Sequence, residues 1–281
     1  MAEITFLVFT FNEERRLDYI LRCVKSYGDI VVIDNFSADR TIEIARQYTD
    51  NVYQFKNPGY IENEETMSFA LSKANTKWVY LTYVDELLPI PLLEELTRIS
   101  KQDQYDIVEI YRKNFMYGQE IYNYGKHHLR MFVPNTVDFK GNMIHKLGRY
   151  LVNKSRVHKT RATDDTSIWH FSSYDSSKLE LAHNRYANLE AAQLHGVGKR
   201  FSGLRAVLKL MFYFWGTYIG LGGIRGGWPG FFISVQIAYF KFSIEARLWE
   251  YDNNVSLEEI ERRYDSLKET LLAEASEKHA S

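Results

Sequence analysis

Two consecutive segments near the N-terminus share one pattern: an apolar run, a polar turn and the start of an amphipathic stretch. The first, Ile4–Glu14, has the sequence ITFLVFTFNEE, and the second, Ile30–Thr41, has the sequence IVVIDNFSADRT. Short apolar runs bounded by polar turn residues are typical of buried strands, and apolar residues at three- and four-residue spacing are typical of helices. Two such units in a row predict the order β-α-β-α, with which a parallel α/β sheet begins.

The alternation of strands and helices continues to about residue 112 and then becomes irregular. Asn12 is predicted to cap a first helix whose apolar face carries Leu17 and Val24. The next strands are predicted at Asp29–Asp34, Val52–Phe55, Lys77–Tyr83, Tyr105–Arg112 and Leu129–Val133, and the next helices at Asp39–Tyr48, Glu62–Ala74 and Leu92–Ser100. The segment Lys113–Ser173 has no clean period, and strands and loops are expected there.

Beyond Ser176 the pattern changes to helix. Ser177–Leu194 is predicted to be a charged amphipathic helix. Ser256 followed by Glu259 forms the capping box of a last helix. The apolar stripe of that helix consists of Leu257, Ile260, Tyr264, Leu267 and Leu271. We therefore predict an α/β domain over residues 1–175 and a helical C-terminal region over residues 176–281.

Two uncharged aromatic runs, Leu210–Ile224 and Gly226–Phe240, lie inside this helical region. Each is shorter than the roughly 20 apolar residues that a membrane-spanning helix needs. Glycines between the runs and cations around them predict a helical hairpin over about residues 199–250, turned at Gly220–Gly230 and lying at a membrane surface. The alternative is that the same apolar surface packs on the first domain or forms the core of a homodimer.

Composition narrows the class of protein and its location. The net charge of −1 gives no general attraction for nucleic acid, so no nucleic-acid partner is expected. A single cysteine, Cys23, excludes an internal disulfide and fits a reducing compartment. The N-terminus leads into a strand without a basic segment, which is not typical of a signal peptide. We therefore expect a cytoplasmic protein, attached peripherally to the inner face of the cell membrane.

Polar residues with candidate chemistry gather where the predicted strands end. In parallel α/β sheets, ligands bind at the carboxyl ends of the strands. The residues that fall there are Thr10, Asn12, Glu13, Asp34 and Asp39. At such a strand end, Asp34 is suited to accept hydrogen bonds from the base or ribose of a nucleotide. The alternative is structural, because aspartate often caps a turn, as Asp34 would, or a helix N-terminus, as Asp39 would.

The pairing of F-N-E-E at Phe11–Glu14 with V-V-I-D-N-F-S-A-D-R-T at Val31–Thr41 resembles the inverting family 2 glycosyltransferases. Within that family it is similar to the branch of lipopolysaccharide-core β-1,4-glucosyltransferase-like proteins. The resemblance covers most of the chain, strongly through Glu86 and again around Ile224–Glu250. It implies a GT-A-type nucleotide-sugar-binding domain with a mixed, mainly parallel sheet. It also implies a nucleotide-sugar donor, with a UDP-sugar favoured, and a bacterial surface-glycan or lipid-linked acceptor.

The resemblance also implies a metal site after the strand that ends at Tyr83. Relatives usually carry Asp-x-Asp-Glu where this chain has Tyr83-Val84-Asp85-Glu86. Asp85 keeps the position that commonly touches a divalent cation, Mn²⁺ or Mg²⁺, whereas Tyr83 replaces the first aspartate. His170 matches a family histidine that can ligate metal. We therefore expect metal use that is weakened but retained.

Further site residues follow from the same resemblance. His145-Lys146 stands where relatives often have His-Glu near the acceptor. An inverting transfer needs one general base, for which Glu86 is the first candidate and His145 the second. Lys146 is expected near the diphosphate, and Arg185 is expected to contact phosphate or acceptor. The acidic residues common in the family are missing at Tyr83, Lys146 and Gly226.

Three classes of function remain open from the sequence. The first is a membrane-associated glycosyltransferase of bacterial surface-polysaccharide synthesis, favoured by the retained Asp34, Asp85, Glu86, His145 and His170. The second is a catalytically silent homologue that binds a nucleotide sugar or glycan within an assembly, favoured by the three missing acids. The third is a nucleotidyltransferase on a similar sheet, which is disfavoured because T-F-N-E-E stands where such enzymes carry a glycine- and lysine-rich loop.

Overall fold

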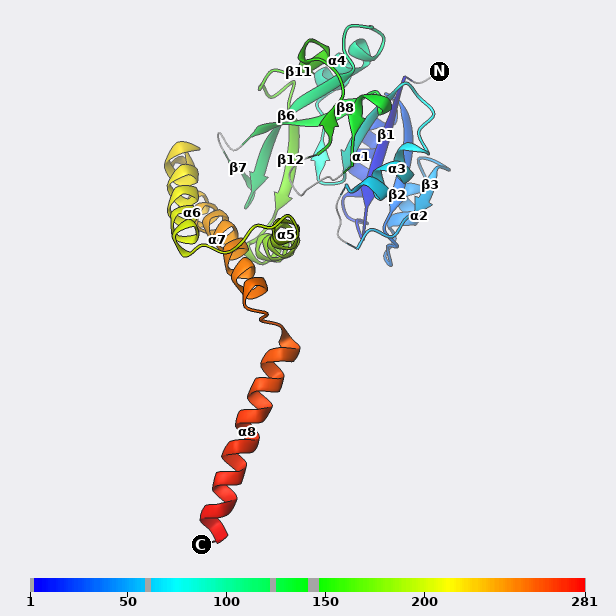
Figure 1. The fold of residues 1–281 in the computed structure, drawn as a ribbon. Helices are drawn as coiled ribbons and strands as arrows, with labels where there is room; N and C mark the ends of the chain where they lie inside the picture. Colours follow the sequence, from blue (N-terminus) through cyan, green and yellow to red (C-terminus); the bar gives the residue numbers. More distant parts are fainter. Residues whose placement is uncertain (1–2, 59–61, 122–124, 141–146, 281) are drawn as a thin grey trace. The chain divides into compact units, whose positions relative to one another are not determined.

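The computed structural model describes residues 3–58, 62–121, 125–140 and 147–280 (Figure 1). The chain divides into two compact units. One comprises Met1–Glu180 with Thr217–Ile233, and the other comprises Leu181–Gly216 with Ser234–Ser281. The sequence places a boundary after residue 175. The first unit continues to Glu180 and also takes in the turn between two late helices.

The first half of the sheet has the alternating order that the sequence predicts. Its strands are β1 (Ile4–Thr10), β2 (Asp29–Asp34), β3 (Val52–Gln54) and β4 (Trp78–Tyr83). The helices between them are α1 (Leu17–Val24), α2 (Thr41–Ala45) and α3 (Glu64–Leu71). The strands lie in the order β3-β2-β1-β4, and every neighbouring pair is parallel. Parallel pairing brings the carboxyl ends of β1, β2 and β4 to one edge of the sheet.

The second half of the sheet carries the antiparallel pairs. Its elements are β5 (Glu86–Leu87), α4 (Ile90–Ser100), β6 (Ile107–Met116), β7 (Gln119–Glu120), β8 (Lys126–Phe132), β11 (Val157–Lys159) and β12 (Ile168–Ser173). β8 runs antiparallel between β4 and β6, β12 runs parallel to β6, and β5 is antiparallel to β12. A separate antiparallel pair joins β9 (Val137–Asp138) to β10 (Arg149–Tyr150). The main sheet is therefore mixed and mainly parallel, as predicted.

The core explains why the first strand has an almost unbroken apolar sequence. Phe6 of β1 belongs to the buried cluster that includes Leu17 and Ile20 of α1. Its neighbour Leu7 belongs to the cluster on the other face, with Met67 of α3. Successive side chains of a strand point to opposite faces, so a strand covered by helices on both faces is apolar throughout.

One sequence prediction about the first turn is wrong. Asn12 does not cap α1, which begins at Leu17 after Arg16. Asn12 instead has a φ of 52°, a left-handed conformation that asparagine tolerates better than most residues. Its Oδ1 accepts a hydrogen bond from the backbone N–H of Ala38 at 2.8 Å. Because Ala38 lies in the turn after β2, Asn12 ties together the two turns at the edge where the parallel strands end.

The C-terminal part is helical, as predicted. It contains α5 (Ser176–Gly196), α6 (Gly203–Trp215), α7 (Gly227–Asp252) and α8 (Leu257–Ala280). The hydroxyl of Ser256 accepts a hydrogen bond from the N–H of Glu259 at 3.2 Å, so the predicted cap of α8 is present. On the apolar stripe of α8, Leu257, Tyr264, Leu267 and Leu271 are exposed.

The chain reverses direction between α6 and α7, as predicted. Arg205, early in α6, pairs with Glu245, late in α7, whereas Tyr213 at the end of α6 lies near Lys241. Such pairing is antiparallel. The short helical turns Gly216–Gly220 and Gly223–Gly226 connect the two helices. A Cβ at Gly230 would lie 1.9 Å from the carbonyl oxygen of Gly223, so this close approach requires glycine.

By length and composition, none of the individual helices in the described chain meets the requirements of a membrane span. The consecutive segments Gly203–Gly220 and Gly223–Asp252 meet them only when they are taken together, with a bend between them.

Candidate active site

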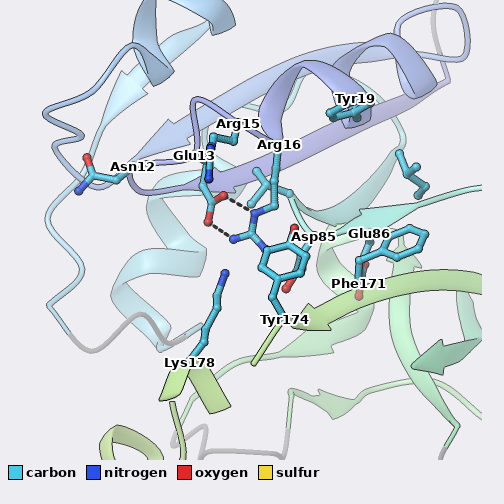
Figure 2. A pocket seen from close by; sticks show the side chains of 12 residues that line it. Asn12, Glu13, Arg15, Arg16, Tyr19, Asp85, Glu86, Phe171, Tyr174 and Lys178 are labelled. Carbon is cyan, nitrogen blue, oxygen red and sulfur yellow. Dashed lines mark hydrogen bonds and ion pairs between the residues drawn. The ribbon is translucent and has the colours of Figure 1, made fainter. Parts of the chain in front are cut away.

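A pocket of about 690 Å³ lies at the carboxyl ends of β1 and β4 (Figure 2). Three segments line it: residues 12–19 after β1, residues 84–87 after β4, and residues 171–178 from β12 into α5. Glu13, Asp85 and Glu86 are its acidic side chains, all of which the sequence singled out. The site therefore forms where parallel strand ends meet, as expected for an α/β sheet.

Asp85 lines the pocket, and His170 lies directly behind it, outside the lining. Asp85 Oδ2 is 3.3 Å from His170 Nε2, and the Asp85 side chain is 26% exposed, so it remains accessible from the pocket. Burial by itself raises the pKa of Asp85. The opposing effects of His170, Arg16 and Arg112 are larger together, and they hold the pKa well below the usual aspartate range. Asp85 is therefore an anionic carboxylate at any physiological pH.

A third residue orients the histidine. His170 Nδ1 is 2.8 Å from Asn114 Oδ1 of β6, and an amide oxygen can only accept, so Nδ1 carries the proton. Asn114 is buried. In the neutral ring, Nε2 then presents its lone pair toward the Asp85 carboxylate. Two electron-rich atoms at this separation are stabilised by a second proton on the ring or by a cation that both atoms contact.

The Asp85–His170 pair fits a divalent cation. Neighbouring ligands of an octahedral cation at about 2.1 Å lie about 3.0 Å apart, close to the separation of these two atoms. Within the described residues, no group of three or more His, Cys, Asp and Glu side chains is placed to hold a metal. A cation here would take its remaining ligands from phosphate oxygens and water, as Mg²⁺ commonly does. The structure thus places the two predicted metal ligands, Asp85 and His170, next to each other, and their binding of a metal stays a prediction.

Glu86 lies deeper in the protein than Asp85. Its side chain is 1% exposed, and Arg130 Nη2 of β8 donates to its Oε1 at 2.6 Å. Arg112 Nη1 of β6 lies 3.7 Å from the same oxygen. The other oxygen, Oε2, is buried and has no hydrogen-bond partner among the residues that the structure describes. Glu86 therefore forms a structural ion pair and keeps one buried oxygen without a partner among the described residues, and its role as the base stays a prediction.

Tyr83 replaces the missing aspartate with a different set of contacts. Its hydroxyl donates to Glu62 Oε1 at 2.7 Å, and its ring lies 4.6 Å from the guanidinium carbon of Arg130. Glu64 and Glu65 are exposed, but Glu62 precedes α3 and binds Tyr83. Tyr83 thus supports the arginine that pairs with Glu86.

The pocket also contains cations that the sequence did not single out. Arg16 forms a double hydrogen bond to Glu13, with Nε to Oε2 at 2.7 Å and Nη2 to Oε1 at 2.5 Å. Lys178 extends from α5 toward this pair, and its ammonium lies 4.8 Å from the ring of Tyr174 (Figure 2). Basic residues at helix starts are common on protein surfaces, so only the tertiary structure reveals that these two face a pocket.

The predicted nucleotide residues lie at the ends of β1 and β2. Thr10 and Asp34 are register partners in neighbouring strands, and both are buried. Asp34 accepts hydrogen bonds from the backbone N–H and the hydroxyl of Ser37, at 2.9 and 2.5 Å, and from Gln54 Nε2 at 3.2 Å. The buried hydroxyl of Thr10 has no partner within the described part of the chain. Neither Thr10 nor Asp34 is among the residues that line the pocket, so their contact with a nucleotide stays a prediction.

Asp39 holds the same loops together. It accepts hydrogen bonds from the N–H of Thr41 at 3.0 Å and from the N–H of Glu14 at 3.1 Å. Burial raises the pKa of Asp39, but the hydrogen bond from the Thr41 hydroxyl and these two backbone hydrogen bonds outweigh it, and the pKa is lowered. Asp39 thus has the structural role at the start of α2 that the sequence offered as the alternative. Its contact with a nucleotide stays a prediction.

Substitution Asp34→Ala is expected to weaken the binding of UDP at least tenfold, about 1.4 kcal/mol. The change removes the acceptor that organises Ser37 and Gln54 at the strand end. Isothermal titration calorimetry measures the effect. Asp29→Ala is the matched control, because Asp29 is the exposed residue at the opposite end of the same strand. Equal UDP affinities for the two variants would remove Asp34 from the site.

Three other predicted residues are not placed in this pocket. His145 and Lys146 lie outside the described residues. Arg185 belongs to the second unit, where its guanidinium lies 4.8 Å from the ring of Tyr186, so its contact with the donor or acceptor stays a prediction. Gly226 is the third position, after Tyr83 and Lys146, at which this chain lacks the acidic residue common in the family. Its carbonyl accepts a hydrogen bond from Gln119 Nε2 at 3.1 Å.

Known proteins of similar sequence are glycosyltransferases by name. An uncharacterized glycosyltransferase of Rickettsia typhi is 26% identical over 278 residues, which cover 89% of this chain and 88% of that protein. One of Rickettsia felis is 25% identical over 278 residues, covering 89% of this chain and 90% of that protein.

Solved structures with some similarity include S. aureus TarS 1-349 in complex with UDP-GlcNAc, with a TM-score of 0.48, 13% identity, and coverage of 90% of this chain and 92% of that one. Another is the mannosyltransferase PcManGT from Pyrobaculum calidifontis in complex with GDP-Man and Mn²⁺, with a TM-score of 0.45, 13% identity, and coverage of 96% and 80%.

The family is shown by the sequence itself. Residues 5–169 match the family model described as glycosyl transferase family 2. This range runs from β1 to the start of β12, contains the other strands of the main sheet whole, and includes Asp34, Asp85 and Glu86. The GT-A-like fold, with its mixed sheet and helical C-terminal region, is the one that the sequence resemblance implied. The chain belongs to glycosyl transferase family 2.

Proposed function

We propose that this protein is an inverting hexosyltransferase that moves a sugar from a nucleotide-sugar donor, with a UDP-sugar favoured, to a bacterial surface-glycan or lipid-linked acceptor such as the lipopolysaccharide core. The observation that carries the proposal is that Asp85 lines the pocket at the carboxyl ends of the parallel strands and lies 3.3 Å from His170. Such a pair is suited to hold the cation that accompanies a nucleoside diphosphate.

The donor would bind along the edge formed by β1, β2 and β4. The buried hydroxyl of Thr10 and the carboxylate of Asp34 would meet the nucleoside. Arg16 and Lys178 would offer positive charge to the diphosphate within the pocket. Charge placed where a leaving group becomes more negative stabilises the transition state. A divalent cation held by Asp85 and His170 would neutralise the departing diphosphate further.

The chemical step needs a proton acceptor. In an inverting transfer, an acceptor hydroxyl oxygen forms a bond to the anomeric carbon while the bond from that carbon to the diphosphate breaks. The hydroxyl proton would pass to Glu86, whose Oε2 is not used by Arg130. Asn114 acts as a positioning residue, because it fixes the ring of His170 beside Asp85.

The catalytically silent homologue remains the second candidate, and one observation favours it. Glu86 is 1% exposed and ion-paired, so its carboxylate is held by the fold as well as directed to the pocket. A silent homologue would bind a nucleotide sugar without turning it over. Binding and turnover must therefore be measured separately.

A donor screen tests the proposal. UDP-, GDP- and dTDP-sugars are incubated with the protein, with and without Mn²⁺, and release of the nucleoside diphosphate is followed. We expect slow hydrolysis of a UDP-sugar that EDTA reduces and millimolar Mn²⁺ or Mg²⁺ restores. Full turnover in EDTA would mean that protein cations alone stabilise the diphosphate. Tight nucleotide-sugar binding without turnover for any donor, with lipopolysaccharide-type acceptors also present, would establish the silent homologue instead.

A further inference from the structure

Helix α6 has its polar and apolar sides reversed with respect to an ordinary surface helix. Its apolar side chains are largely exposed: Leu204, Val207, Leu208, Met211, Phe212 and Trp215. Leu204 and Phe212 are more than two-thirds exposed, at 73% and 71%. These residues follow one another at three- and four-residue spacing, so they form a single stripe along the helix. We call this stripe the α6 apolar face.

The cations of α6 are turned the other way. Arg205 donates to Glu245 of α7 through Nε and Nη2, both at 2.7 Å, and Lys209 Nζ lies 2.8 Å from the same carboxylate. Glu245 is completely buried. Figure 1 shows α6 and α7 beside each other, as these ion pairs require. The two cations of α6 thus pair with a buried carboxylate, and the uncharged apolar face of the helix is exposed to solvent.

This arrangement does not suit a surface in water. A soluble surface helix places its apolar stripe against the core and its charges in solvent. Contiguous exposed apolar patches on soluble proteins mark sites of interaction with proteins or membranes. The α6 apolar face carries Trp215 and Phe212. Tryptophan is enriched at membrane interfaces, and tryptophan, phenylalanine and leucine are common on the apolar faces of helices that lie there. The helix is therefore built for a partner that is itself apolar.

The charge of the surrounding sequence identifies the partner. No Asp or Glu occurs between Glu190 and Glu245. The same stretch contains Lys199, Arg200, Arg205, Lys209, Arg225 and Lys241. Lys199 and Arg200 immediately precede α6 and are exposed. Arg205 and Lys209 pair with Glu245, Lys241 pairs with Glu190, and Arg200 lies 3.5 Å from Asp252. The outward positive charge beside α6 is therefore that of Lys199 and the exposed Arg200. A second copy of this chain, docked face to face on α6, would add the same exposed cations and no acidic residue from this stretch. Anionic lipid headgroups would neutralise them.

We propose that the α6 apolar face inserts into the interfacial zone of an anionic lipid bilayer, with Lys199 and Arg200 contacting the headgroups. Apolar burial and attraction to anionic lipid act together in such helices. The attachment is peripheral, through one face of one helix. It is a property of the second unit and is independent of whether the pocket turns over a nucleotide sugar.

Vesicle binding by the full-length protein tests this inference. Vesicles of phosphatidylcholine with phosphatidylglycerol are compared with phosphatidylcholine alone, in a flotation assay without donor or acceptor. We expect binding to the anionic vesicles that weakens with added salt. The double variant Phe212→Ser/Trp215→Ser should lower the partition coefficient at least about tenfold, because two large side chains no longer leave water. The matched control is Leu267→Ser/Leu271→Ser, which changes two exposed apolar residues of α8.

A second double variant tests the electrostatic part of vesicle binding. Lys199→Gln/Arg200→Gln should lower binding to anionic vesicles at least about tenfold and leave binding to neutral vesicles unchanged, since each cation near an anionic surface contributes about 1 kcal/mol. Circular dichroism and UDP affinity confirm that each variant keeps its fold.

Two results would overturn the inference. The first is an intact protein that does not float with either vesicle. The second is a soluble dimer that Phe212→Ser/Trp215→Ser converts to monomer, which would make the α6 apolar face a subunit interface. Both are visible by light scattering and flotation whether or not the protein is an active transferase, so the proposed function can fail independently.

Discussion

Replacing Asp85 by asparagine is expected to lower kcat/KM for the nucleotide-sugar donor at least about 100-fold, a magnitude typical for the loss of one electrostatic contact in a transition state. The substitution keeps the size of the side chain and removes its negative charge. His170 Nε2 then faces an amide instead of a carboxylate, 3.3 Å away in the present structure. The affinity for a divalent cation should fall with the rate, so the Mn²⁺ concentration needed for half-maximal activity should rise.

The measurement is the initial rate of nucleoside diphosphate release at varied donor and Mn²⁺ concentrations. Asp50→Asn is the control, because Asp50 is an exposed aspartate in the turn before β3. Asn114→Ala provides a second comparison, since it should lower the metal affinity through His170 without removing a pocket carboxylate. An Asp85→Asn enzyme that retains more than a tenth of the activity would show that the carboxylate is not part of the catalytic site.

Replacing Arg130 by methionine is expected to lower the free energy of unfolding by about 3 kcal/mol or more, because it leaves the buried carboxylate of Glu86 without its main partner. Arg130 and Glu86 are 3% and 1% exposed, and 2.6 Å separates their paired atoms. Arg112 remains 3.7 Å from that carboxylate and offsets part of the loss. Urea unfolding gives the value. Arg22→Met, which breaks a solvent-exposed pair on α1, should change stability by less than about 1 kcal/mol.

The double variant Glu86→Gln/Arg130→Met separates the two roles of Glu86. It should recover part of the stability lost in Arg130→Met, since no buried charge is then left unpaired. Glu86→Gln alone should keep the fold and lower kcat at least about 100-fold if Glu86 is the base. A folded Glu86→Gln enzyme with normal kcat would confine Glu86 to its ion pair and transfer the role of base to another group.

The positions of the site carboxylates could be predicted from the sequence because local pattern fixes where strands end. The runs Asp29–Asp34 and Trp78–Tyr83 end in polar residues, and parallel pairing brings those ends to one edge. The partners of those residues could not be predicted. Glu86 pairs with Arg130 and His170 with Asn114, across 44 and 56 positions of sequence. Partners that far apart in the sequence cannot be predicted from a local pattern, because the order of strands in the sheet decides which residues meet.

The sequence by itself determined the alternating β-α order, the double-sided burial of β1 and the reversal near Gly220–Gly230, because strand and helix periods, apolar runs and glycines act locally. The direction in which α6 faces was decided only by the tertiary structure. Its sequence contains an apolar side and a cationic side, and either could have been turned inward. The buried carboxylate of Glu245 on α7 attracts Arg205 and Lys209, and that long-range pairing turns the apolar side outward.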